Sequence, residues 1–332
     1  MRYKDTDFLH ASSRVAYMEN QLITKDDLMK AIDADSPAEA FRLLSAKNLF
    51  RDCGIDDYEQ AFDKNMEETC EMIEEITNEL GLTYIFRYPV DGHNMKVIVK
   101  SKTAAGDFSD LYKPGGTVSA DTMKQELDSG SFEEVPEILG RAGLEAAEKL
   151  AKTKDSQIVD LIIDKAVIAL TVKKSEEIDC EALTEYTKAK IDLINIKSAL
   201  RLMRIKSDVY TASKVFAEGG SFSVRELEAA YTMGYDGIKL LLEGAQRGEV
   251  LAEAVSEIKN GGSVGIFEKQ ADKCFRELFE NTKIIPFGIE PVITFLYLKD
   301  REIRACRLVL VSKIFGLSKE KITERLRYIY AD

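Results

Sequence analysis

The chain has 332 residues, of which 45% are hydrophobic and 31% charged, and its 58 acidic and 46 basic side chains give a net charge of −12. A chain of this length is too long to fold around one small hydrophobic core, so we predict two or three packed units. The acidic balance argues against a general nucleic-acid binder, which needs a basic face to displace counterions. The chain has only six prolines, which favours long amphipathic helices. It has only two histidines, which disfavours a histidine-based metal site or acid–base mechanism.

Apolar residues recur with helical spacing along most of the chain, and hydroxyl side chains mark where helices begin. Ser36 before Pro37, with Glu39 three residues on, is typical of a capped helix start with proline in the first helical position. Only residues 83–90 have the composition of a strand, and the proline within them weakens that interpretation. The sequence therefore predicts an almost entirely helical protein.

The N-terminus lacks the apolar segment of a secretory leader, and no apolar run approaches the roughly 20 residues of a membrane span. The longest apolar run covers residues 292–298. The five cysteines are far apart and form no Cys-x-x-Cys motif, so we expect reduced and mostly buried thiols.

Residues 52–79 form a strongly acidic segment with eleven Asp and Glu side chains and one Lys. Apolar residues such as Phe62 and Ile73 recur on one side of it. Two interpretations remain open: the segment is a solvated acidic helix face, or it is an electrostatic docking surface for a basic partner.

Two short patterns repeat along the chain in phase. The first, Asp-x-x-Asn-x-Lys, occurs at 91–96 and 192–197, and a weaker copy containing Glu302 and Arg304 follows; the central residues are 101 and 107 positions apart. The second pattern is an apolar residue, then Ser or Thr, then charged residues and another apolar residue. Its four copies lie at 23–28, 118–123, 222–227 and 317–322. Together the patterns predict three similar helical units.

Units of about 100 residues are much longer than the roughly 33–47 residues of two-helix solenoid repeats. We therefore expect an all-α fold with three similar helical domains around a pseudo-threefold axis. Approximate boundaries are 1–110, 111–215 and 216–332, and the N- and C-terminal helices are able to pair. The polar faces of the three signature helices are expected to converge on this axis, although such faces equally suit ordinary surface helices.

No pattern of catalytic or ligand-binding residues stands out. A phosphate-binding P-loop is missing, and the glycine-rich residues 260–265 follow a helical region rather than a strand. Asp160 and Asp164 lie one helical turn apart, but a lone pair fits a solvated face better than a cation site. His93 stands where the second copy of the pattern has Ile194, which indicates packing. We expect no catalytic residue, no metal and no cofactor.

Two C-terminal segments resemble the C subunit of the V-type and A-type ATP synthases, the counterpart of the d subunit of the vacuolar ATPase. They are FGIEPVITFLYLKDREIR at 287–304 and GLSKEKITERLRY at 316–328. The two complete Asp-x-x-Asn-x-Lys copies and the opening residues 13–15 are similar to the same family. The resemblance covers essentially the full length. It departs from the family pattern at Gly92 and at Ala305-Cys306, where a longer aliphatic side chain is expected.

The resemblance implies a funnel-shaped, non-catalytic component of the central stalk. Such a component is a socket that links the rotor shaft, made of subunits D and F, to the ring of membrane proteolipids. It transmits torque for ion transport coupled to ATP synthesis or hydrolysis. It lies on the cytoplasmic side as a peripheral component, without a cofactor, and contacts the membrane only through the complex.

The polar signature residues near the expected cavity are the candidate partner contacts. They are Asn94, Lys96, Asn195, Lys197, Arg201, Arg304 and Arg307. Two other functions remain open. One is a stand-alone helical adaptor that binds a soluble basic partner through residues 52–79. The other is an all-α enzyme with a pocket between the units.

Overall fold

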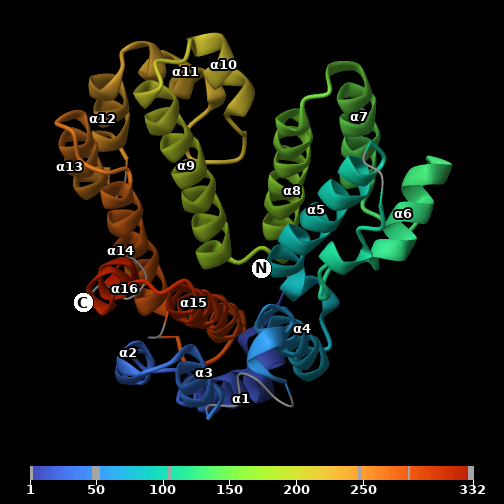
Figure 1. Cartoon of the computed structure of the whole chain (residues 1–332), viewed down its shortest axis with the longest axis vertical. Helices are drawn as coiled ribbons and strands as arrows, with labels where there is room; N and C mark the ends of the chain where they lie inside the picture. The colour runs from blue at the N-terminus through green and yellow to red at the C-terminus, as the bar shows by residue number, and fades with distance from the viewer. Residues whose placement is uncertain (1–2, 47–52, 104–105, 246–247, 283–284, 328–332) are drawn as a thin grey trace.

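The computed structural model describes residues 3–46, 53–103, 106–245, 248–282 and 285–327. Within these ranges every regular element is a helix, sixteen of them α-helices, which confirms the predicted all-helical fold. Residues 83–90, the only candidate strand, belong to a short 3₁₀ turn and the α-helix that follows it. Three groups of these helices diverge from a common junction (Figure 1).

One group is continuous in the sequence and packs around its own apolar core, which includes the fully buried Met95, Leu139 and Ile163. Its helices are α5 (Tyr84–Ser101), α6 (Ala120–Ser129), α7 (Glu137–Thr153) and α8 (Ser156–Ile178). Helices α5 and α8 approach closely at Gly92, where a Cβ atom would lie 2.5 Å from Val167 Cγ2. This contact explains why the first signature has a glycine.

The second group is also continuous, and its core includes the fully buried Ile196, Leu227 and Ile238. Its helices are α9 (Glu181–Arg204), α10 (Val209–Val215), α11 (Val224–Thr232), α12 (Tyr235–Glu243), α13 (Gly248–Lys259) and α14 (Gly265–Thr282). The long helices α9 and α14 lie side by side and connect this group to the junction (Figure 1).

The third group combines both ends of the chain. Its helices are α1 (Leu9–Glu19), α2 (Lys25–Asp33), α3 (Pro37–Ser45), α4 (Tyr58–Thr77), α15 (Ile289–Ile314) and α16 (Lys319–Arg327). The N-terminal Leu28 and Phe62 share a core with the C-terminal Val309 and Leu310, all fully buried. Helix α15 contacts α1, α2, α3, α4 and α16, so the N- and C-terminal helices pair.

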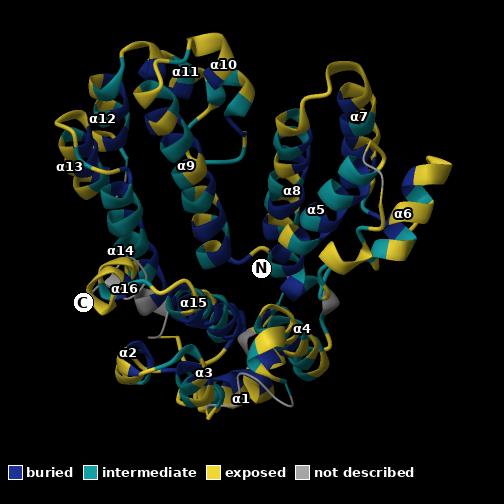
Figure 2. Ribbon diagram, viewed as in Figure 1, coloured by how far each residue is buried: buried dark blue, intermediate teal, exposed yellow. Residues whose placement is uncertain are grey.

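A fourth apolar cluster joins the three groups at the junction. It contains Ile73 of α4, Ile85 of α5, Leu183 of α9, Phe275 of α14 and Phe295 of α15, all buried. Each such side chain contributes about 1.5–3 kcal/mol when it is fully removed from water. The inner faces of the groups are buried and their outer faces exposed (Figure 2).

Aromatic rings fix the contact between α9, α14 and α15. The ring of Tyr186 lies edge-on to Phe275, Phe279 and Tyr297, with centroids 5.2–5.5 Å apart. Phe279 and Tyr297 stack at 4.0 Å. Edge-to-face aromatic pairs add about 0.5–1.5 kcal/mol each beyond the area that they bury.

The hydroxyl side chains of the second repeated pattern cap helices, as their sequence context predicts. Thr24, Ser119, Ser223 and Ser318 each accept a hydrogen bond from the backbone N–H three residues on, at the starts of α2, α6, α11 and α16. Ser36 caps α3 in the same way. Such caps stabilise a helix by about 1 kcal/mol. Among the described residues, no helix combines the length and apolarity needed to cross a bilayer.

Candidate functional site

The first polar signature ties α5 to the loop that precedes α6. The Asp91 carboxylate accepts hydrogen bonds from the Thr117 backbone N–H at 2.8 Å and from the Thr117 hydroxyl at 2.6 Å. The Asn94 amide pairs with both backbone groups of Lys113, donating to the carbonyl and accepting from the N–H, each at 2.9 Å. These side chains therefore satisfy loop backbone groups that no regular element pairs.

The second signature makes the same contacts in α9. Asp192 accepts the backbone N–H of Ser221 at 2.9 Å, and Asn195 pairs with both backbone groups of Ala217 at 2.8 and 2.9 Å. A glycine precedes the bound residue in both copies. A Cβ atom at Gly116 or Gly220 would lie 2.3 or 2.2 Å from the signature carboxylate, so any other residue would displace this carboxylate from its loop. The repeat found in the sequence is thus a repeat of atomic contacts.

The third signature contacts the other end of the chain. Glu302 of α15 is buried, accepts the Ile23 backbone N–H at 2.6 Å and pairs with Lys299 at 2.7 Å. Ile23 directly precedes the Thr24 cap of α2. In all three copies the signature helix therefore binds the loop that leads into a Ser- or Thr-capped helix.

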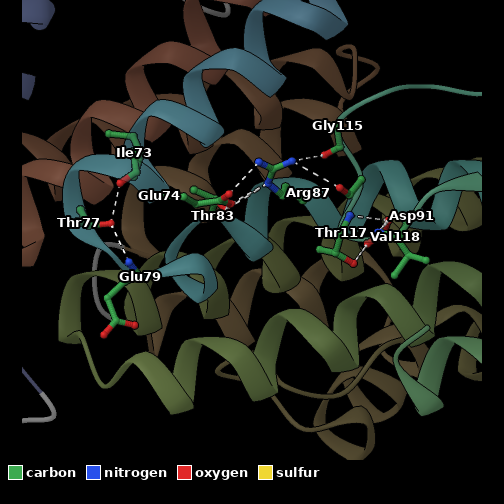
Figure 3. A network of polar contacts seen from close by, with 11 residues as sticks. Ile73, Glu74, Thr77, Glu79, Thr83, Arg87, Asp91, Gly115, Thr117 and Val118 are labelled. Atoms are coloured by element: carbon green, nitrogen blue, oxygen red, sulfur yellow. Dashed lines mark hydrogen bonds and ion pairs between the residues drawn. The ribbon is translucent and has the colours of Figure 1, made fainter. Parts of the chain in front are cut away.

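A buried ion pair extends the first of these contacts toward α4 (Figure 3). Arg87 of α5 donates to Glu74 at 2.9 and 3.1 Å and to the carbonyl groups of Gly115 and Gly116 at 3.3 and 3.4 Å. Thr83 donates to the same carboxylate. The guanidinium group thus joins α4 and α5 to the loop that Asp91 and Asn94 hold.

The candidate Lys96 on α5 forms an ion pair with α8, and so does Lys100 one turn further along. The Lys96 Nζ atom lies 2.6 Å from Asp164 Oδ1, and Lys100 Nζ lies 2.6 Å from Asp160 Oδ1. Asp160 and Asp164 therefore each pair with a lysine of α5. Partly exposed pairs of this kind contribute about 0–1 kcal/mol each.

Basic candidates of the other two signature helices also pair with carboxylates of neighbouring helices. Lys197 and Arg201 of α9 both approach Glu268 of α14, at 2.9 and 3.5 Å. Arg307 of α15 lies 2.8 Å from Asp63 of α4. The sequence predicted these residues as partner contacts, and it did not reveal their carboxylate neighbours.

A hollow of about 400 Å³ opens between α4, α5, α9 and α15, and we call it the junction hollow. Of the seven candidate residues, Arg304 and Arg307 line it, together with Arg87, Lys113 and Lys190. Asn94 and Asn195 are buried and bound to their loops, while Lys96, Lys197 and Arg201 lie on other helix pairs.

Charges around the junction hollow influence one another. Asp300, whose Oδ2 atom lies 2.8 Å from Arg304 Nε, raises the pKa of that guanidinium group. Burial, and then the charge of Arg304, lower the pKa of the Lys190 ammonium group. On the wall formed by α4, burial and Glu71 raise the pKa of Glu67. Sequence reasoning missed Lys190, because the corresponding positions of the other copies are Pro89 and Tyr297.

The acidic helix α4 uses several of its carboxylates inside the protein. Glu74 binds Arg87, Asp63 binds Lys113 as well as Arg307, and Glu59 lies 3.1 Å from Arg307 Nε. Other acidic side chains of this helix, including Glu68, Glu71 and Glu75, are exposed. Asp52, the first acidic residue of the predicted segment, lies outside the described residues.

The described part of the chain contains no group of three or more His, Cys, Asp and Glu side chains placed to hold a metal ion. Cys70, Cys180 and Cys306 are buried, and burial raises the thiol pKa of Cys70 to about 12 and that of Cys180 to about 11. His93 lies with its Nε2 atom 2.9 Å from the Leu111 carbonyl oxygen. The arrangement suits a helical scaffold whose polar side chains bind backbone and neighbouring helices.

Comparison with known proteins identifies the kind of scaffold. Residues 11–325 match the model of the family described as ATP synthase (C/AC39) subunit, and the chain belongs to this family. It is a family of non-catalytic subunits of V/A-type rotary ATPases. The resemblance inferred from the signatures and the C-terminal segments is thereby confirmed.

Several relatives align over nearly their whole length. The chain is 24% identical to the C subunit of the A-type ATP synthase of Haloquadratum walsbyi, with 95% of this chain and 96% of the relative covered. It is 22% identical to the C subunit of the V-type sodium ATPase of Enterococcus hirae, with 94% and 95% covered. Identity to the C subunit of the A-type ATP synthase of Methanothermobacter thermautotrophicus is 25%, with 92% and 84% covered.

Proposed function

We propose that this protein is the central-stalk socket of a V/A-type rotary ATPase or ATP synthase. It links the rotor shaft, formed by subunits D and F, to the membrane proteolipid ring and transmits torque between them. The observation that carries this proposal is the family match across residues 11–325, supported by relatives that are the C subunits of such complexes. The protein then lies at the cytoplasmic side of the membrane and contacts it through the complex.

The repeated contacts of the signature helices support a pseudo-threefold, funnel-shaped arrangement. In this proposal each unit is built around one signature helix and the loop that it binds, and the unit of α15 includes the N-terminal helices. The predicted boundaries near residues 110 and 215 remain a prediction, and they differ from these units because they fall between α5 or α9 and the loop that each helix binds. A socket assembled from three similar units spreads torque over a broad contact area.

Partner contacts in this proposal come from the exposed basic side chains of the signature helices. Lys197, Arg201 and Arg304 retain solvent-exposed side chains of 28%, 63% and 60% despite their ion pairs. Asn94 and Asn195 shape the socket from within, because their amides hold its loops. Lys96 and Arg307 are also partly exposed and complete the basic set.

The first test is isolation of the tagged full-length protein from gently solubilised membranes of its source. Mass spectrometry is expected to find the proteolipid together with shaft subunits D and F. Recovery of soluble proteins alone would contradict the socket and favour an adaptor that binds through the exposed carboxylates of α4.

A second test uses the double variant Lys197→Glu/Arg201→Glu. We expect weaker assembly into the complex while the isolated variant stays folded. The matched control is Glu268→Gln, which removes the shared carboxylate partner but keeps both cations. If the control impairs assembly as much as the double variant, the basic side chains act within the protein itself and are not partner contacts.

A further inference from the structure

One cation of the junction hollow differs from the others in its surroundings. Arg87, Lys113, Arg304 and Arg307 all form ion pairs with carboxylates. Lys190 forms no ion pair with any residue in the described ranges, and its Nζ atom lies 5.6 Å from the centroid of the Tyr186 ring.

The position of Lys190 is electrostatically unfavourable for the isolated protein. The ammonium group is partly removed from water, and the like charge of Arg304 acts on it across the hollow. Asp300 attracts it, but this carboxylate is already paired with Arg304 at 2.8 Å. A desolvated cation whose close neighbour is an aromatic ring and not a carboxylate keeps much of its desolvation cost, whereas an incoming anion would remove it.

We propose that Lys190, assisted by Arg304, binds the carboxylate of an acidic side chain that a partner protein inserts into the junction hollow. The inference rests on the proposed function, and the partner is the end of the rotor shaft. Lys190 provides one charge-assisted hydrogen-bond donor, and the Arg304 side chain, 60% exposed, provides a second charge at the opening.

The lining of the hollow selects this class of ligand. Its walls include the partly exposed apolar side chains of Met66, Phe86 and Val90, which suit the aliphatic stem of Asp or Glu. Three carboxyl groups, Asp63, Glu67 and Asp300, also line it and disfavour a multiply charged anion such as phosphate. The volume of about 400 Å³ accommodates a few side chains and not a whole helix.

The test compares binding of the full-length protein to a purified complex of subunits D and F. The variant Lys190→Met is expected to bind roughly tenfold or more weakly, because a buried charge-assisted contact is lost. Its unfolding midpoint as an isolated protein is expected to equal or exceed that of the wild type, whereas a structural role would lower it. Lys190→Arg should retain most of the affinity.

The matched control is Lys188→Met, which removes an exposed cation from the same helix outside the junction hollow. It is expected to bind the shaft within about twofold of the wild type. Zero-length carbodiimide coupling supplies a direct readout, since it should join Lys190 to an Asp or Glu of the shaft in a peptide found by mass spectrometry.

Unchanged shaft affinity of Lys190→Met would overturn the inference and leave the socket intact. A wild type that does not bind the shaft would instead refute the proposed function, and the inference with it. A third outcome is that sulfate stabilises the wild type but not Lys190→Met, while the variant binds the shaft normally. Lys190 would then bind a free anion and not a carboxylate of the shaft, and the inference would be wrong.

Discussion

The carboxylate of Glu302 accepts a hydrogen bond from the backbone N–H of Ile23, and this contact joins N-terminal and C-terminal segments that are 279 positions apart in the chain. The same carboxylate pairs with Lys299, and both partners are largely buried. The group that contains both chain ends thus uses the same kind of contact that Asn94 and Asn195 make within continuous segments.

Replacement of Glu302 tests how much this contact between the chain ends stabilises the protein. Glu302→Ala leaves the Ile23 N–H unpaired and Lys299 without a counter-charge, so we expect a loss of about 3–5 kcal/mol in the free energy of unfolding. Glu302→Gln retains an acceptor for the Ile23 N–H, so its free energy of unfolding should fall clearly less. Chemical denaturation measures both, and hydrogen exchange should report faster opening of α2 in the alanine variant. Equal losses in the two variants would contradict this assignment.

Asn195 provides the corresponding test in the second group. Asn195→Ala leaves the backbone N–H and carbonyl of Ala217 without partners in a buried position, which costs about 2–4 kcal/mol. Lys188→Ala, at an exposed position of the same helix, should stay within about 0.5 kcal/mol of the wild type. Urea unfolding of the isolated protein measures both. An Asn195 variant as stable as this control would mean that the loop contact contributes little.

The pH dependence of stability provides a third test, at Asp91. Burial raises the pKa of this carboxyl to about 6, despite its hydrogen bonds from Thr117 and Val118. The folded protein therefore holds the proton more tightly than the unfolded chain, whose Asp pKa is about 3.9. The contribution of this group to stability is largest in acid and falls as the pH rises from about 4 to 6, by about 3 kcal/mol in total.

Asp91→Asn removes this dependence while its amide oxygen still accepts the loop N–H. Between pH 4 and 7, the wild type should lose up to about 3 kcal/mol more stability than the variant. The exposed substitution Asp121→Asn is the control and should follow the wild type. The free energy of unfolding is measured with urea at each pH. If it changes with pH equally in the wild type and in Asp91→Asn, burial does not raise the pKa of Asp91.

Local patterns in the sequence predicted the helices and their caps, because those interactions join residues three or four positions apart. Thr24 and Ser223 are examples, since each binds a backbone N–H three residues on. The repeated signatures were equally visible. They predicted three related helices with polar faces, and the contacts of Asp91 and Asp192 confirm that these two positions correspond.

What the polar faces bind could not be read from the sequence. Helical periodicity places Asn94 and Lys96 on a helix surface, but it does not show which loop or helix covers that surface. Asn94 binds a loop residue 19 positions on, and Lys96 binds a helix 68 positions on. For the same reason, the sequence could not show that Lys190 forms no ion pair with the described residues, because this depends on where the carboxylates of three other helices lie in the fold.

The pairing of the chain ends has a consequence for synthesis. Apolar faces of α2 and α3 emerge early from the ribosome, yet Val309 and Leu310, against which they pack, are added about 260 residues later. At translation rates of roughly 5–20 residues per second, this interval lasts about 15–50 s. The other two groups complete their cores from contiguous sequence in the meantime. The nascent N-terminal segment therefore waits longer for its packing partners than either of the other two groups.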